Sequence, residues 1–507
     1  MLNKILATWK SDQKRIAVIF NSTHYTYSEI FFISSIVANN LYQQGIRKGS
    51  RIALFMNNRP ELIYLYFAIF KLGAIAVPIN YRYKSVELNT VLQNCQANML
   101  ITESEKEQYL TRLSLKIFSI SDEFNKNWDN FSLLLDKTTA PHPDIEVRED
   151  DLGAILYTSG STSQPKGVMH SHHTLFAAAQ NLIKTINQNE TCISGITLPI
   201  CHIAGMIGQV ISTLLVGGKI ILFPKFDPVS LVKAIEKHKI THLQMVPINL
   251  VELVNYVDQT HADLTSLRCV MVGGDKVPET IQEKFLKLTH CYITEVMGMT
   301  ESFSYCVNLL QNTKKLGSVG QAAAGVEINI VDKYDHAVKN LEVGEIKIHS
   351  QANMIGYWKN RKETIKTLKN GWIYSGDLAY QDQDKFIWFV GRKKQLIIRG
   401  GSNISPQEVE NVLIQHPSIK ETCVVGYPDQ NLNQIVCACV VLNNQVALSL
   451  QDIKNFCKNL LSDYKTPEKL FIFKKLPRNA TGKLDRKKII ATALKLHNQH
   501  IDDDQDC

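Results

Sequence analysis

The sequence predicts an α/β protein with a large N-terminal domain of parallel-rich sheets and helices, a small β-barrel-like part, and a small mobile α+β C-terminal domain. Three observations support this prediction. Helical and strand-like apolar segments alternate from Tyr25 to about Phe223, which is typical of parallel sheets. Short segments with antiparallel character follow residue 325. After Gly391, the chain has enough helices and strands for a domain of its own.

The elements follow from apolar periodicity and from the turn residues between them. The expected helices are Glu61–Leu72, Pro228–His238, Pro406–Gln415 and Ser449–Leu461. The expected strands are Ala74–Pro78, Gly153–Tyr157, Thr241–Val246, Ser266–Val272, Val326–Val331, Gly344–Ile348, Phe386–Val390, Glu421–Gly426 and Ile435–Leu442. We therefore expect a large N-terminal domain at residues 1–390, a hinge at 391–394 and a C-terminal domain at 395–507 with an acidic tail at 502–507.

Composition narrows the class of protein. Apolar residues make up 45% and charged residues 21% of the 507 residues, which is ordinary for a globular protein. Lys and Arg outnumber Asp and Glu by 56 to 48 without forming a dense basic block, so a nucleic-acid partner is not expected. The 11 cysteines include no Cys-x-x-Cys pair, which favours free thiols in a reducing, cytoplasmic compartment.

Membrane segments are not expected either. The N-terminus has no apolar core of a signal peptide. Two apolar runs, Leu62–Ile79 and Gly205–Phe223, are interrupted by Gly, Pro, Gln or Lys, and each is better explained as a buried helix, a turn and a buried strand. At most a peripheral membrane association is expected.

The stretch Tyr157–Gly167 has the residues of a phosphate-binding loop. Backbone N–H groups of small residues can wrap phosphate oxygens, hydroxyl groups add donors, and Lys166 adds a positive charge. It is not a Walker A loop, because Pro165 replaces the second Gly and Gly167 stands where Ser or Thr would hold magnesium. The alternative is a flexible Ser/Gly linker, but a linker needs no Lys-Gly immediately before an apolar helix.

This loop resembles the signature of the adenylate-forming (AMP-binding) superfamily, which includes acyl-CoA synthetases, luciferases and nonribosomal-peptide adenylation domains. The resemblance extends from Tyr25 to about Lys488. Further motifs follow in the family's order at Leu198–His202, Gly273–Asp275, Met297–Glu301, Gly371–Leu378, Gly391–Glu408 and Pro477–Lys483.

The resemblance implies a role for each matching residue in ATP binding. The residues expected at the β- and γ-phosphates are Thr158, Ser159, Gly160, Ser161, Thr162 and Lys166. Thr300 would contact the α-phosphate and Glu301 would hold Mg²⁺, which takes oxygen ligands. The segments expected near adenine contain Gly273, Gly274, Asp275, Met297 and Gly298.

The C-terminal motifs imply roles that change between two reaction steps. Asp377 would bind the ribose hydroxyls with Arg392; the alternatives are an Asx turn for the acid and a solvated surface charge for the arginine. Lys483 would bridge the acyl carboxylate and the α-phosphate, whereas most lysines in such loops are exposed and idle. Lys394 matches the hinge, and Gly400-Gly401 would line the path of CoA.

Histidines invite other interpretations. His202 resembles the residue beside the acyl pocket, with Ala204 and Gly205 also lining it; the alternative is a general base, which a substrate acid ionised at neutral pH does not need. The cluster of His170, His172 and His173 opens a helix and is expected at the surface or in a cap. No metal-ligand spacing with carboxylates or Cys is present around these histidines.

Two positions depart from the family pattern. Ser163 stands where the loop usually ends its turn with Gly, and Met297 stands where an aromatic residue usually supports adenine. Neither departure removes a charge that the chemistry needs, so an active enzyme is expected.

Together the motifs predict an ATP-dependent acid–thiol ligase that makes acyl-CoA from a medium- or long-chain carboxylic acid through an acyl-adenylate, using ATP, Mg²⁺ and CoA. The small apolar segment Cys201–Leu215 favours an apolar tail over an amino acid, which would want a buried polar partner. The alternatives are an aryl-CoA ligase, an enzyme that loads a carrier protein, oxidation of the adenylate, and a silent scaffold protein. The partners expected are small molecules, and a homodimer is compatible with the sequence.

Overall fold

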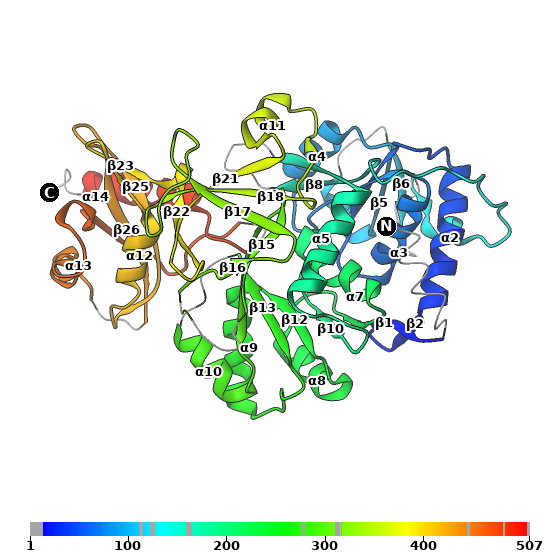
Figure 1. The fold of residues 1–507 in the computed structure, drawn as a ribbon, viewed down its shortest axis with the longest axis horizontal. Helices are drawn as coiled ribbons and strands as arrows, with labels where there is room; N and C mark the ends of the chain where they lie inside the picture. The colour runs from blue at the N-terminus through cyan, green and yellow to red at the C-terminus, as the bar shows by residue number, and fades with distance from the viewer. Residues whose placement is uncertain are drawn as a thin grey trace. The chain divides into compact units, whose positions relative to one another are not determined.

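The computed structural model describes residues 14–503, apart from 111–114, 122–126, 159–164, 275–276, 278, 310–314, 316, 444–446 and 480–481. The chain divides into two compact units (Figure 1). Unit 1 contains Met1–Ile328 and Ile348–Tyr374, and unit 2 contains Asn329–Lys347 and Ser375–Cys507. The predicted hinge at 391–394 lies within unit 2 in this division, and its role stays a prediction.

The first sheet of unit 1 has the strand order β16-β15-β14-β13-β12-β10-β11-β1-β2. Strands β1, β11, β10, β12, β13 and β14 pair in parallel, and antiparallel pairs occur only toward the two edges of this described sheet. The bounds are β1 (Ile16–Phe20), β2 (Thr23–Thr26), β10 (Ile193–Ile196), β11 (Lys219–Leu222), β12 (His242–Met245), β13 (Cys269–Gly273), β14 (Ile293–Met299), β15 (Phe303–Asn308) and β16 (Gln321–Ala322).

The second sheet of unit 1 has the order β19-β9-β8-β4-β3-β5-β6-β7. Its bounds are β3 (Arg51–Phe55), β4 (Ile75–Pro78), β5 (Met99–Thr102), β6 (Lys116–Ser119), β7 (Asp129–Asn130), β8 (Leu152–Thr158), β9 (Lys166–Ser171) and β19 (Gly356–Tyr357). The pairs from β8 to β7 are parallel, whereas β9 pairs antiparallel with both β8 and β19. The expected parallel-rich α/β architecture is confirmed.

Helices cover both faces of the first sheet. Apolar side chains of α8 (Pro228–His238), α9 (Pro247–Thr260) and α10 (Glu279–Thr289) pack with one set of strand residues in a single buried cluster. Alternate residues of the same strands, such as Val18 and Ile220, belong to the cluster on the other face. The other helical segments of unit 1 are α2 (Tyr27–Gln43), α3 (Pro60–Lys71), α4 (Ser85–Cys95), η1 (Ser104–Tyr109), η2 (Phe131–Leu135), α5 (His172–Thr185), α6 (Ile203–Gly205), η3 (Met206–Ile211), α7 (Ser212–Leu215) and α11 (Arg361–Thr367).

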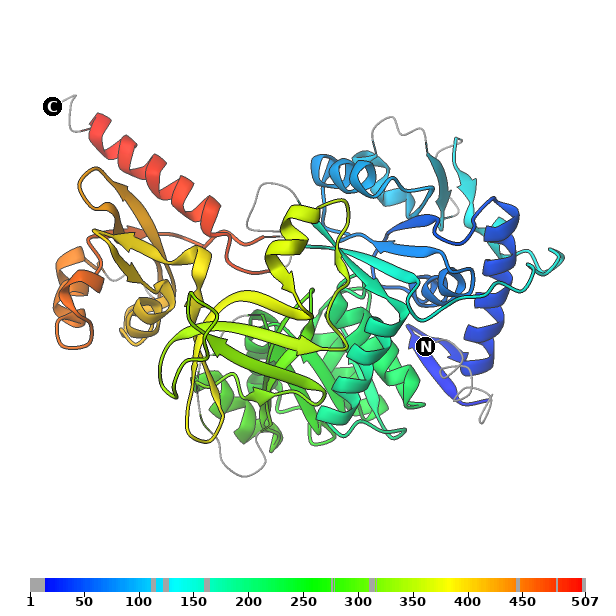
Figure 2. The same ribbon diagram turned by 45° about the horizontal axis from the view of Figure 1, so that its top comes forward.

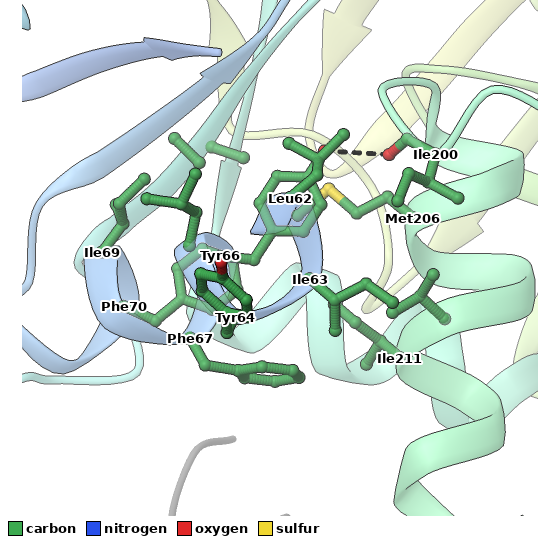
Figure 3. Close-up of a cluster of buried hydrophobic side chains, with 14 of the residues drawn as sticks. Leu62, Ile63, Tyr64, Tyr66, Phe67, Ile69, Phe70, Ile200, Met206 and Ile211 are labelled. Carbon is green, nitrogen blue, oxygen red and sulfur yellow. Dashed lines mark hydrogen bonds between the residues drawn. The ribbon is translucent and has the colours of Figure 1, made fainter. Parts of the chain in front are cut away.

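Helix α3 is buried along nearly its whole length. Pro60 at its first turn supplies a preset φ, and Lys71 complements the dipole in the last turn. Apolar side chains occur all round the helix, which is typical of a helix without a solvent face. Figure 3 shows this packing, in which α3 lies against Ile200, Met206 and Ile211.

The two apolar runs that resemble membrane spans form a helix, a turn and a strand, as predicted. The first becomes α3 followed by β4, and the second becomes α6, η3 and α7 followed by β11. Within the described ranges, none of the helices has the length and hydropathy needed to cross a membrane.

A third, smaller sheet has the order β17-β18-β21-β20, with β22 beside β21. This sheet corresponds to the part of the chain that was expected to be small and β-barrel-like. Its bounds are β17 (Val326–Val331), β18 (Gly344–Ser350), β20 (Leu368–Lys369), β21 (Trp372–Gln381) and β22 (Ile387–Arg392). Arg392 therefore ends a strand, and the residues that follow it form the short helix η4 (Lys393–Gln395).

Unit 2 contains the α+β fold expected after the hinge. Its sheet has the order β24-β23-β26-β25, with β27 beside β26. In Figures 1 and 2 the C-terminal helix α14 (Arg486–Asp503), drawn in red, lies beside this sheet. The remaining bounds are β23 (Ile397–Arg399), β24 (Ser402–Ile404), α12 (Pro406–Leu413), β25 (Ile419–Asp429), β26 (Asn433–Leu442), α13 (Leu450–Cys457), η5 (Asp463–Lys465) and β27 (Lys469–Ile472).

Candidate functional site

The motif segments of unit 1 follow the carboxyl ends of parallel strands. Segment 198–205 follows β10, Gly273 ends β13, and Met297 lies near the end of β14. Strand β12 lies between β10 and β13, so these ends are neighbours at one edge of the sheet (Figure 1). In open α/β sheets, ligands bind in the crevice outside such ends. Segments distant in the sequence are thus brought to one edge.

The phosphate loop connects two paired strands. Thr158 ends β8, Lys166 begins β9, and these two residues are direct cross-strand partners. Lys166 and Gly167 therefore enter a strand, and helix α5 begins only at His172, which corrects the expectation of a helix directly after them. Ser159, Gly160, Ser161, Thr162 and Ser163 lie outside the described residues, as does Asp275 of the adenine segment.

Lys166 and Glu301 gather around one tyrosine. The hydroxyl of Tyr357 donates a hydrogen bond of 2.6 Å to Oε1 of Glu301. The ammonium of Lys166 lies 5.1 Å from the centroid of the Tyr357 ring and forms an ion pair with Glu363 on α11. Burial is the main cause that raises the pKa of Tyr357, and the Glu301 carboxylate raises it further, so the phenol stays protonated and donates.

Thr300 is held through its backbone. His170 is fully buried, and its Nε2 lies 2.8 Å from the carbonyl oxygen of Thr300, while Nδ1 lies 3.0 Å from Oγ1 of Thr174. Burial lowers the pKa of His170 to about 4, so the ring is neutral at pH 7 and donates from Nε2. His172 is also buried, which corrects the expected surface position of this cluster; only the His173 side chain is substantially exposed.

The adenine segments depend on glycine. A Cβ on Gly273 would lie 2.6 Å from the carbonyl oxygen of Val296, and one on Gly298 would lie 2.7 Å from that of Phe303. Gly274 has φ of +97°, which favours glycine. Met297 is half-buried on β14. Phe303, which follows Glu301 in the turn to β15, has φ of +61°, an uncommon conformation for a bulky residue that marks local strain.

Segment 198–205 is fixed by three buried polar side chains. Asn58 bonds both the carbonyl of Leu198 and the amide of Ile200, and the Tyr66 hydroxyl donates to the carbonyl of Ile200 at 2.8 Å (Figure 3). His202 is half-buried, with Nε2 3.3 Å from Nδ2 of Asn80. Ala204 and Gly205 lie on α6, and a Cβ on Gly205 would clash with the Pro199 carbonyl.

Two buried glutamines lie in and beside the helical turn that follows. Met206–Ile211 forms a π-helix, an element that is frequent at functional sites. Gln209 is 2% exposed and Gln244, on β12, is 7% exposed. The carboxamide oxygens of both accept no hydrogen bond from the described residues. A Cβ on Gly208 would lie 2.8 Å from the Gln244 oxygen.

In unit 2, Asp377 and Arg392 are direct cross-strand partners on β21 and β22. Nε of Arg392 lies 3.0 Å from Oδ1 of Asp377, whose side chain is 2% exposed while that of the arginine is 50% exposed. Asp377 therefore lies in a strand and not in an Asx turn, and the structure brings together the two residues predicted to bind ribose. Gly376, with φ of +73°, turns the chain directly before the acid.

The other predicted residues of unit 2 lie in turns. Lys483 is exposed, and its amide donates to Oδ1 of Asn479 at 3.1 Å. Arg478 braces this turn by donating to the Gly482 carbonyl and pairing with Glu421. Lys394 lies in η4, and Gly400 and Gly401 form the turn between β23 and β24 with φ of +51° and +87°.

Sequence reasoning missed Glu363, Tyr357 and His170. Glu363 is the one acid in the basic run from Lys359 to Lys366, a weak signal that could have marked it. The other two had no signal, because their roles depend on which backbone groups and side chains the fold brings to them. The described residues hold no group of three or more His, Cys, Asp or Glu able to bind a metal ion.

Comparisons with known proteins identify the family of this chain. The family model described as AMP-binding enzyme matches residues 7–358, and that described as AMP-binding enzyme C-terminal domain matches residues 408–483. Among curated relatives, the medium-chain fatty-acid–CoA ligase of Escherichia coli (strain K12) is 31% identical over 494 residues, covering 93% of this chain and 86% of the relative. The 2-succinylbenzoate–CoA ligase of Bacillus subtilis (strain 168) is 31% identical over 488 residues, covering 94% and 95%.

A solved structure gives the same picture. The o-succinylbenzoate CoA synthetase of Bacillus subtilis, in complex with its acyl-adenylate intermediate, is similar with a TM-score of 0.85 and 28% identity, covering 96% of this chain and 97% of that one. The same enzyme has also been solved with ATP and a magnesium ion. The chain therefore belongs to the AMP-binding enzyme family of adenylate-forming acid–CoA ligases.

Proposed function

We propose that this protein makes acyl-CoA from an apolar medium- or long-chain carboxylic acid. A carboxylate oxygen attacks the α-phosphorus of ATP, a P–O bond breaks and pyrophosphate leaves. The thiol of CoA then attacks the acyl carbon. The bond between that carbon and the phosphate oxygen breaks, and AMP leaves. The observation that carries the proposal is that Lys166 and Glu301 both contact Tyr357. Lys166 is also the cross-strand partner of Thr158, at the start of the phosphate loop.

In each unit, the predicted residues have surroundings that suit their proposed roles. Charge develops on phosphate oxygens in the first step, so the chemistry needs cations and oriented donors more than a nucleophile. Lys166 would serve the β- and γ-phosphates with Thr158, and Thr300 would donate to the α-phosphate from a backbone that His170 holds. Asp377 and Arg392 form a charged pair suited to two ribose hydroxyls.

The donor set around Glu301 fits Mg²⁺. Magnesium is usually held by one or two carboxylates together with substrate phosphates, and a dedicated protein cage is not needed. Glu301 is a buried carboxylate whose one oxygen is oriented by Tyr357, and the described residues contain no larger ligand cluster. Bound there with the nucleotide, the ion would neutralise charge on the phosphates.

The nature of the acid is supported by two observations that point in different directions. Small and apolar residues of Cys201–Leu215 favour an apolar tail, and relatives include ligases named for medium- and long-chain fatty acids. The buried carboxamides of Gln209 and Gln244 favour a second candidate, an aryl or ring-bearing acid with a polar group, because buried carbonyl oxygens want donors. Relatives named for 2-succinylbenzoate, indoleacetate and feruloyl-CoA agree with that candidate.

A panel of acids tests both candidates. Pyrophosphate release is measured with fatty acids of increasing length and with aryl acids that carry or lack a polar group, each with and without CoA. Turnover that peaks with medium or long unbranched acids supports the first candidate, and turnover confined to polar aryl acids supports the second. Turnover that needs a carrier protein and ignores CoA would replace the proposed acceptor.

The alternation between steps is proposed at Lys394. Proline fixes φ, so Lys394→Pro should hinder the rotation of the backbone there. We expect slower formation of acyl-CoA with unchanged formation of the adenylate, because only the second step needs the rotation. If the variant has the same overall turnover as the parent enzyme, Lys394 is not the hinge.

A further inference from the structure

Lys166 has an anionic partner within the protein itself. Its ammonium forms an ion pair with Oε2 of Glu363, and the two side chains are only 13% and 23% exposed. Both residues belong to unit 1, so the contact does not depend on the placement of unit 2. A carboxylate presents two anionic oxygens to an ammonium much as a phosphate does.

The fold holds Glu363 firmly at this position. Strand β19 pairs with β9, and the amide of Trp358 donates to the carbonyl of Gly167 at 2.7 Å. Helix α11 follows immediately, and the amide of Glu363 donates to the Oδ1 of its N-cap, Asn360, at 3.1 Å. Thr364, the next residue, accepts a hydrogen bond of 2.9 Å from the amide of Tyr357.

Gly167 brings these segments close together. A Cβ on Gly167 would lie 2.7 Å from Cγ2 of Ile155 and 3.2 Å from Cβ of Trp358. The carboxylate of Glu363 is therefore carried on a helix whose start is tied to the strand that Lys166 begins. Glu363 therefore does not lie on an unconstrained surface loop.

We propose that Glu363 is a phosphate-mimicking counter-ion that competes with the triphosphate of ATP for Lys166 and thereby lowers the affinity for ATP. The inference rests on the role of Lys166 under Proposed function. A triphosphate that takes up Lys166 must displace Glu363, and the released carboxylate then lies near the incoming negative charge. AMP has no β- or γ-phosphate, so its binding does not meet this competition.

The size of the effect follows from population arithmetic. The apparent dissociation constant of a ligand rises by the inverse of the fraction of protein that is competent to bind it, so an ion pair that is mostly closed weakens binding by that factor. Ion pairs of this partly exposed kind change equilibria modestly, and we expect a factor of about 3–10. Salt should reduce it, because screening weakens the pair.

Calorimetric titration of the full-length chain with ATP, pyrophosphate and AMP, each with Mg²⁺, tests the inference. Glu363→Gln keeps the shape and removes the charge, and it should tighten binding of ATP and pyrophosphate about 3–10-fold with AMP unchanged. In a Lys166→Gln background the same change should tighten binding less, because the competition needs both partners and only the repulsion between Glu363 and the phosphates is then removed. Glu252→Gln, which removes an exposed carboxylate of α9, is the matched control and should change none of the three affinities.

Unchanged or weaker binding of ATP by Glu363→Gln would overturn the inference, and equal tightening of AMP would reduce it to a general charge effect. Glu363→Ala repeats the measurement if the melting temperature of the glutamine variant falls. Failure here is separable from failure of the proposed function. If the parent chain forms adenylate but Glu363→Gln binds ATP as the parent does, only the competition is wrong.

Discussion

The two lysines predicted to act in catalysis are held in opposite ways. In unit 1, Lys166 begins a strand, is largely buried, and contacts both Tyr357 and Glu363. In unit 2, Lys483 is exposed on a turn whose backbone is braced by Asn479 and Arg478, so the turn is fixed while the residue itself is exposed. A cation needed throughout nucleotide binding suits the first arrangement, and a cation needed for one step suits the second.

The largest expected effect is on Lys483. Loss of one charge that stabilises a phosphoryl-transfer transition state costs about 10²–10³-fold in rate, so Lys483→Ala should slow adenylate formation by that amount. Transfer of a supplied acyl-adenylate to CoA should keep its rate, because the second step does not use this charge. Single-turnover assays of each step measure the difference; equal losses in both would remove the contrast between the two lysines. Lys488→Ala, on α14, is the control.

The next effect concerns Asp377. Hydrogen bonds to a charged group contribute about 1.5–3 kcal/mol, so Asp377→Asn should weaken AMP binding about 10–100-fold. Calorimetric titration with AMP measures this. Asp335→Asn, which changes a half-exposed partner of Lys347 in the same unit, should leave AMP binding as it was. If Asp377→Asn keeps the AMP affinity of the parent protein, Asp377 does not bind ribose, and its ion pair with Arg392 is purely structural.

A smaller effect is expected at Tyr357. Removal of a group that orients a metal-binding carboxylate commonly costs about 10-fold or more in metal affinity, so Tyr357→Phe should raise the Mg²⁺ concentration needed for ATP binding about 10-fold. Calorimetric titration of ATP at a series of Mg²⁺ concentrations measures it. Tyr64→Phe, a buried tyrosine of α3, is the control. An unchanged Mg²⁺ requirement would mean that Glu301 does not depend on the phenol.

The smallest effect is on stability against acid. The pKa of His170 is lowered from 6.5 to about 4 by burial, so the unfolded chain takes up the proton first as the pH falls. Its contribution is complete above pH 6.5 and is lost toward pH 4, at about 1.4 kcal/mol per pH unit. His170→Asn should therefore show a smaller fall in melting temperature between pH 7 and pH 5 than the parent protein. The same fall as in the parent and in the exposed His173→Asn control would contradict this account.

Much of the fold was predictable because its signals are local. The helix predicted at Pro228–His238 and the strand predicted at Val326–Val331 match α8 and β17 to the residue, since Pro, Gly and Asp mark their ends. The prediction of a helix directly after Lys166 was wrong, because a buried apolar run can form either a strand or a helix. Here pairing with β8 and β19 makes it a strand. The end of the strand that contains Arg392 was not predicted for a similar reason: it is defined by pairing with Asp377.

The site was predictable only where a motif carries a charge or a glycine. Asp377 and Arg392 were predicted together and are confirmed as neighbours, although their role stays a prediction. Glu363 and Tyr357 could not be found, because their meaning depends on contacts with Lys166 and Glu301 that arise from strand pairing. Gln209 and Gln244 were not predicted as site residues, because their burial and the missing partners of their carboxamide oxygens are known only from the structure.

The most direct test of the central claim is ATP–pyrophosphate exchange by the parent chain without CoA. The adenylation step is complete before any thiol is needed, so labelled pyrophosphate should enter ATP only when a suitable acid is present, and CoA should not be required. Exchange without any acid, absence of exchange with every acid of the panel, or formation of ADP and phosphate in place of AMP and pyrophosphate would contradict an adenylate-forming ligase.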